Sequence, residues 1–81
     1  MIKNILHGAK KTTEKLTELA KVNYDIRVVE QSIKEIAHLA YEYRFSAMPG
    51  AQEHYEDCKT ALAVLRLKKN LLELKKEMIV G

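Results

Sequence analysis

One Pro-Gly pair, Pro49-Gly50, interrupts an otherwise continuous helical pattern in this chain of 81 residues. Proline and glycine are poorly compatible with a helix interior, and proline also biases the preceding residue, Met48, away from helical backbone angles. The pattern predicts one helix over about residues 3–45, a turn at 46–50 and a second helix over about 51–79. We therefore expect a single all-α domain, 1–81, that is an antiparallel, coiled-coil-like two-helix hairpin.

The first predicted helix carries an apolar stripe whose members recur in steps of three and four, as in a helix that packs along one face. The stripe consists of Ile2, Ile5, Ala9, Leu16, Leu19, Val22, Ile26, Val29, Ile33, Ile36, Ala40 and Tyr43, with Thr12 filling the one gap between Ala9 and Leu16. Two successive steps of three, at Leu16, Leu19 and Val22, shift its phase. Thr13 is a second candidate for the helix start, because threonine caps helix N-termini well. In that alternative the first dozen residues form a looser arm.

The second predicted helix carries two apolar stripes that together nearly encircle it. The first consists of Tyr55, Cys58, Leu62 and Leu65, and the second of Val64, Leu67, Leu71, Leu74 and Met78. A helix covered by a single neighbour needs an apolar face only about 100° wide. The surplus predicts that a second neighbour covers this helix.

The unequal helix lengths lead to the same expectation. The first helix exceeds the second by about a dozen residues, or roughly 18 Å at 1.5 Å per residue, so a lone hairpin leaves its N-terminal apolar side chains uncovered. We expect a homodimer or higher oligomer that forms a four-helix bundle, or completion by a helical protein partner. In the alternative, the arm frays and the leucines are ordinary surface residues. The predicted interface residues are Ile2, Ile5, Leu6, Val64, Leu67, Leu71, Leu74 and Met78.

Four residues are candidate metal ligands. Glu35 and His38 have the Glu-x-x-His spacing of ferritin-like bundles, and Glu53 and His54 lie near the same end of the predicted hairpin. On a helical wheel, however, Glu35 and His38 lie away from the apolar stripe, where a solvated polar face explains them. A small metal-binding helical protein is therefore the alternative to the preferred interpretation, a non-enzymatic protein interaction or assembly module without a cofactor.

The single cysteine, Cys58, cannot form an internal disulfide, so a reducing compartment is expected. Its place on the first stripe favours core packing over a nucleophilic role. Asn23 lies at the phase shift, where it either fixes register as a polar seam residue or lies beside the seam. The aromatic group at the corner is expected to cap the end of the bundle. It consists of Tyr41, Tyr43, Phe45 and Tyr55.

The net charge of +3 is concentrated in residues 1–22, which contain five lysines and two glutamates. A basic amphipathic segment of this kind can contact an anionic membrane surface or nucleic acid phosphates. No aromatic residue alternates with these lysines, so membrane or nucleic acid contact is only a further alternative. The chain has no run of about 18 apolar residues that would span a bilayer, and its polar N-terminus is unlike a secretory signal. We expect a soluble, cytoplasmic protein.

A set of positions within residues 15 to 75 forms a further pattern: Lys21-Val22-Asn23, Ile26, Glu30, Ile33, Ile36, Tyr41, Tyr43, Tyr55, Cys58 and the leucines that follow. At these positions the chain resembles the N-terminal helical hairpin of small uncharacterised bacterial proteins that end in a zinc ribbon. This sequence reaches Gly81 without the paired cysteines of a ribbon, so no zinc function is transferred to it. The resemblance implies a helical association module from a bacterium or a phage.

Overall fold

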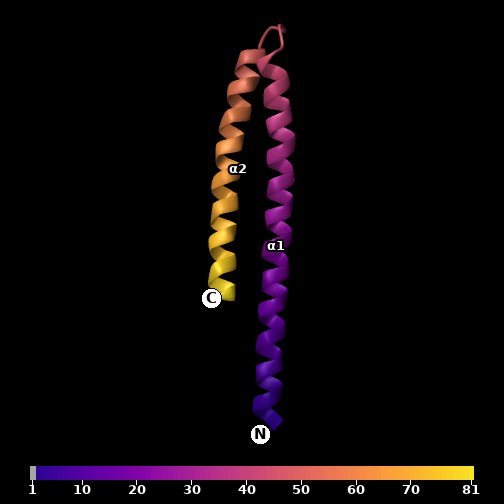
Figure 1. Ribbon diagram of the computed structural model, residues 1–81, viewed down its shortest axis with the longest axis vertical. Coiled ribbons are helices and arrows are strands. Elements are labelled where there is room, and N and C mark those ends of the chain that lie inside the picture. The colour runs from indigo at the N-terminus through magenta and orange to yellow at the C-terminus, as the bar shows by residue number, and fades with distance from the viewer. Residues whose placement is uncertain (1) are drawn as a thin grey trace.

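The chain folds into two long helices joined by a short turn. The computed structural model describes the backbone of residues 2–81 and the side chains of residues 13–81, with α1 at Ile2–Arg44 and α2 at Ala51–Val80. The helices lie side by side in opposite directions, and α1 continues past the end of α2 (Figure 1). The molecule is a rod that measures 71 × 15 × 13 Å. The prediction of an all-α two-helix hairpin is confirmed.

The corner is a tight turn for which Pro49 and Gly50 have the required backbone angles. The backbone N–H of Ala51 donates to the carbonyl oxygen of Met48 at 3.2 Å, and Gly50 has φ 81° and ψ −4°. These features define a type II turn, in which proline favours the second position and glycine the third. The N–H of His54 then donates to the Gly50 carbonyl at 3.1 Å, which begins α2. The reversal of the chain is therefore a local property of these residues.

The two helices meet along one seam in which contact positions alternate by three and four residues. The least exposed side chains in the described part of the chain are all apolar and lie in this seam: Val22, Ile26, Val29, Ala40, Ala51 and Leu62. Half-buried residues continue the same spacing, at Leu19, Ile33, Ile36 and Tyr43 in α1 and at Tyr55, Cys58, Leu65, Lys69, Leu72, Lys76 and Ile79 in α2. The spacing is that of coiled-coil heptads.

Among the described side chains of α1, which start at residue 13, the first seam position is Leu19. The stripe in the sequence passes through Leu16, but the structure leaves this side chain 61% exposed. Leu16 and Leu19 border a hollow together with Ile79 and Val80, at the place where α2 ends. The two steps of three rotate Leu16 away from the seam, since a heptad needs alternate steps of three and four.

Two seam positions of α2 are occupied by lysines. Both Lys69 and Lys76 are half-buried. The Lys69 ammonium nitrogen lies 3.8 Å from Oε1 of Glu30 in α1 and 4.0 Å from Oε1 of Glu73 in its own helix. A long lysine side chain can cover an apolar seam with its methylene groups while the ammonium reaches the edge. The seam is therefore polar at its edge in the half of the hairpin that is remote from the corner.

Candidate interaction surface

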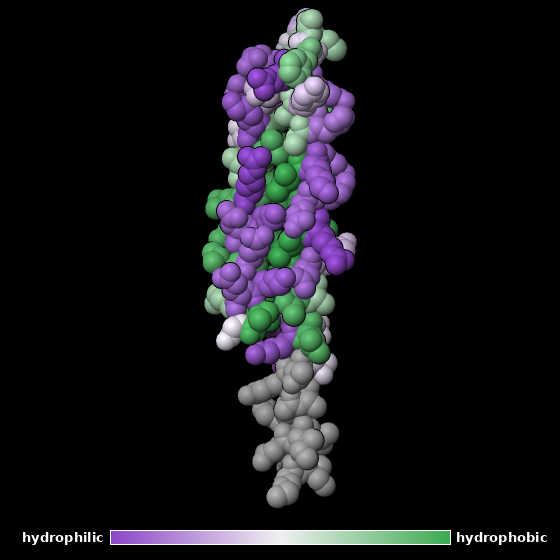
Figure 2. Space-filling view, viewed as in Figure 1, coloured by the Kyte–Doolittle hydropathy of each residue, from purple (hydrophilic) through white to green (hydrophobic). Residues whose placement is uncertain are grey.

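The second apolar stripe of α2 lies outside the seam. Its five residues are between 56% and 83% exposed, and they are Val64, Leu67, Leu71, Leu74 and Met78. We call these five residues the outer stripe. In Figure 2, apolar surface appears both between the helices and along the edge of α2 that faces away from α1. Isolated exposed apolar residues are ordinary in soluble proteins, but a continuous row of them is typical of an interaction site.

The outer stripe has the same alternating spacing as the seam but lies on nearly the opposite side of α2. Each of its members is displaced by two residues from a seam position, as Val64 is from Leu62 and Leu71 is from Lys69. With 3.5 residues per turn, the centres of the seam and the stripe are about 155° apart around the helix axis. The structure therefore gives α2 two faces with coiled-coil spacing, of which α1 covers one.

Charged and polar residues border the outer stripe differently on its two edges. Lys68 and Lys75 lie along one edge, and Asn70 and Glu77 along the other, all of them exposed. Positions that border an apolar contact in this way select partner and orientation in helix pairs. The stripe is thus an apolar row with one basic edge.

The predicted interface residues of α2 all fall on the outer stripe. The remaining three, Ile2, Ile5 and Leu6, belong to the N-terminal part of α1, and their side chains lie outside the described residues. The backbone of this part of α1 is helical and extends beyond the C-terminal end of α2 (Figure 1). Within the hairpin, no stretch of α2 lies alongside it.

The aromatic group at the corner divides into two parts. Tyr43 and Tyr55 are half-buried between the helices, and the ring of Tyr43 stacks on that of His54 with centroids 5.0 Å apart. Tyr41 and Phe45 are exposed and touch each other, with centroids 4.9 Å apart. Only the first two aromatic rings therefore contribute to closing this end of the hairpin.

The candidate metal ligands do not converge. His38 pairs with Glu42 at 3.0 Å, and Glu35 accepts a hydrogen bond from Gln31 at 3.3 Å, all on the exposed surface of α1. His54 lies against Tyr43, as described above, and Glu53 is exposed in the first turn of α2. Among residues 13–81, no three His, Cys, Asp or Glu side chains are grouped so that they could hold a metal ion.

Two further residues singled out in the sequence lie at or beside the seam. Cys58 occupies a half-buried seam position of α2 as a free thiol. Asn23 is half-buried between the seam residues Val22 and Ile26, and it borders a hollow that also includes Glu73 and Lys76 of α2. Asn23 therefore lies beside the seam, which was one of its two predicted positions.

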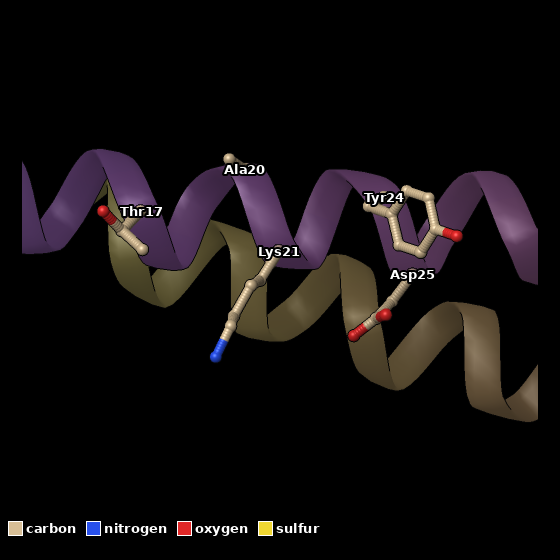
Figure 3. Close-up of a pocket in the computed structure, with 5 residues that line it drawn as sticks. All are labelled: Thr17, Ala20, Lys21, Tyr24 and Asp25. Carbon is tan, nitrogen blue, oxygen red and sulfur yellow. The ribbon is translucent and has the colours of Figure 1, made fainter.

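A hollow on α1 does not enclose a ligand. It is lined by Thr17, Ala20, Lys21, Tyr24 and Asp25. Figure 3 shows that all five side chains come from one helix, while α2 passes behind them without contributing to the lining. A small-molecule site typically surrounds most of its ligand with convergent groups. This hollow is a shallow part of the helix surface.

The fold and its surface define an all-α hairpin with one unpartnered apolar face. Compared with protein-family models, with curated proteins and with solved structures, the chain matches none. The resemblance to the hairpins of zinc-ribbon proteins therefore stays a prediction. Neither helix, over the part of the chain that the structure describes, contains an apolar segment long enough to cross a bilayer.

Proposed function

We propose that this chain is a non-enzymatic, self-assembling helical module that works in the cytoplasm. Its outer stripe packs against a second copy. The N-terminal arm of α1, with Ile2, Ile5 and Leu6, is a separate contact site for a helix of a further copy or of a partner protein. The observation that carries the proposal is the row of five exposed apolar side chains on α2. They have the spacing of a coiled-coil seam and lie on a face that α1 leaves free.

The small core of the hairpin also supports assembly. Six residues of the described chain are buried, and two of them are alanines. A compact domain of this size buries only about 60–65% of its unfolded surface, and a two-helix rod buries less than a compact bundle. A second copy would supply the neighbour that the outer stripe lacks within the hairpin.

The free energy available from the outer stripe is sufficient for association. Covering a large apolar side chain fully is worth about 1.5–3 kcal/mol, so the exposed portions of five side chains are worth about 5–10 kcal/mol per chain. Two chains would together gain about 10–20 kcal/mol, against an association cost of about 4–15 kcal/mol. A dimer is therefore favourable over most of this range.

The proposal is tested by measuring the mass of the assembly in solution. Light scattering and sedimentation at micromolar concentration should show an oligomer for the wild type and a monomer for Leu67→Asp and Leu71→Asp. A carboxylate at either position would be placed in an apolar contact without a partner. Because both leucines are exposed in the hairpin, the variants should keep their helical circular dichroism.

A matched control is Glu56→Ala, an exposed position of α2 away from the outer stripe. This variant should remain as oligomeric as the wild type. A wild-type protein that is helical, stable and monomeric at micromolar concentration would refute the proposed function.

A further inference from the structure

We infer that the second copy docks with its α2 parallel to α2 of the first, outer stripe against outer stripe. The four helices then form one layer in the order α1, α2, α2, α1, with both corners at the same end. This inference rests on the proposed function and goes beyond it by naming the contacting helix and its direction. It is carried by the angular position of the outer stripe, by its residue types and by its edge charges.

The angular position of the stripe decides the arrangement of the helices. In a square four-helix bundle, the two neighbours of each helix lie in directions about 90° apart around its axis. The seam and the outer stripe of α2 are instead about 155° apart, so α2 lies between α1 and its new neighbour. A partner on this face touches α2 without approaching α1, so the four helices form a flat layer and not a square bundle.

The residue types along the stripe fit a pair of helices, and the edge charges decide its direction. Taking Val64 as the first position of a heptad places Leu67 and Leu74 at the fourth position of successive heptads. In parallel coiled coils, a β-branched residue at the first position with leucine at the fourth favours two strands over three or four. Leu71 and Met78 occupy the later first positions and keep the row apolar.

The edge charges disfavour the antiparallel alternative. When two such stripes run in opposite directions, equivalent edges face each other, so Lys68 of each copy would face Lys75 of the other. In a parallel pair, opposite edges meet, and Lys75 lies beside Asn70 of the second copy while Lys68 lies beside Ala63. Like charges held face to face are destabilising. Parallel docking avoids two lysine pairs.

The contact covers only the half of α2 that is remote from the corner. Nearer the corner, the positions in line with the outer stripe are Asp57 and Thr60, both exposed, and the Thr60 hydroxyl donates to the Glu56 carbonyl at 3.2 Å. The apolar row therefore begins at Val64. From there to Met78 it extends over about 21 Å.

Disulfide cross-linking of single cysteines tests the direction of docking. In a Cys58→Ala background, the test variants are Met78→Cys and Val64→Cys, at the two ends of the stripe. Met78 is 83% exposed in the hairpin, so its replacement leaves the seam unchanged. Parallel docking brings each position next to its own copy, within the Cα separation of about 4.4–6.8 Å that a disulfide requires.

In an antiparallel pair the same positions are too far apart. Met78 would then lie opposite Leu67 or Thr60, and the two Met78 positions would be separated by at least about 16 Å along the axis. Val64 would be separated from its copy by a similar distance. We expect both single variants to form covalent dimers under mild oxidation. As the matched control, Glu35→Cys on the exposed surface of α1 should remain largely monomeric on a non-reducing gel.

The outcomes separate this inference from the proposed function. If the protein is oligomeric but neither single variant cross-links above the Glu35→Cys level, the parallel layer is wrong and the assembly function stands. Cross-linking of Met78→Cys mixed with Leu67→Cys, without cross-linking of either alone, would show antiparallel docking. A wild-type monomer in sedimentation would remove the function and the inference together.

Discussion

The ammonium nitrogen of Lys69 lies 3.8 Å from Oε1 of Glu30, which joins α2 to α1 by an ion pair at the edge of their seam. The position of Lys69 in the heptad is one that an apolar residue normally fills. Both side chains keep contact with water, since 33% of the Lys69 side chain and 46% of the Glu30 side chain are exposed. The pair therefore contributes more to the alignment of the helices than to their stability.

We expect the coupling between Glu30 and Lys69 to be small. A double-mutant cycle with Glu30→Gln and Lys69→Met should give an interaction free energy of about 0.2–1 kcal/mol, as for other solvent-accessible pairs. The measurement is the free energy of unfolding in urea for the four proteins. A coupling above about 2 kcal/mol would show that the pair is more deeply buried than the structure indicates.

Val22 and Val28 allow a comparison of the same substitution on two faces of α1. The Val22 side chain is 2% exposed in the seam, whereas Val28 is 47% exposed. Val22→Ala should lower the free energy of unfolding by about 2 kcal/mol through lost burial and a residual cavity. Val28→Ala should change it by less than about 0.5 kcal/mol, because alanine also favours the helix. Equal losses in chemical denaturation would contradict the assignment of the seam.

Gly50 should tolerate substitution poorly although there is room for a side chain. A Cβ at this position would meet no heavy atom within 4 Å, but φ is +81°. Gly50→Ala should therefore cost about 1–2 kcal/mol from backbone strain alone. Gly50→Asn should cost less than Gly50→Ala, because asparagine adopts left-handed angles more readily. Melting temperatures of the two variants measure the difference, and the reverse order would disprove the type II turn.

Metal ions should not stabilise the protein specifically. Glu35 and His38 each have a partner on the same helix, Gln31 and Glu42 respectively, and all four lie on the exposed surface of α1. Titration with Zn²⁺ or Fe²⁺ should leave the melting temperature without a saturable shift. A saturable increase that disappears in both Glu35→Ala and His38→Ala would instead establish a metal site.

Much of the seam follows from the spacing of apolar residues alone. From Leu19 to Tyr43 the steps of three and four in α1 predict which side chains face α2, and the structure places them there. The seam of α2 was predictable as far as Leu65. Beyond Leu65, the apolar pattern is interrupted by Lys69 and Lys76, and their polarity gives no sign that both residues occupy half-buried seam positions.

The residues of the candidate interaction surface were predicted from the surplus of apolar side chains, but their place relative to α1 was not. Val64, Leu67 and Leu71 were expected at an interface because one neighbour cannot cover two stripes. Their exposure on the side of α2 opposite α1 required the structure. Likewise, the sequence grouped Tyr41 and Phe45 with the other aromatic residues, whereas in the fold their side chains remain exposed.

By itself the sequence determined the two helices and the corner between them, because helix-forming side chains and the backbone preferences of Pro49 and Gly50 act over a few neighbouring residues. Only the tertiary structure decided that the seam of α2 continues past Leu65 through Lys69, Leu72, Lys76 and Ile79, which leaves the second stripe on the opposite side of the helix. Beyond Leu65 the second stripe is the more apolar of the two, so the local pattern does not select this continuation. This outcome depends on the direction in which α2 leaves the turn and on which of its faces meets the seam of α1. Both are relations between residues that are distant in the chain.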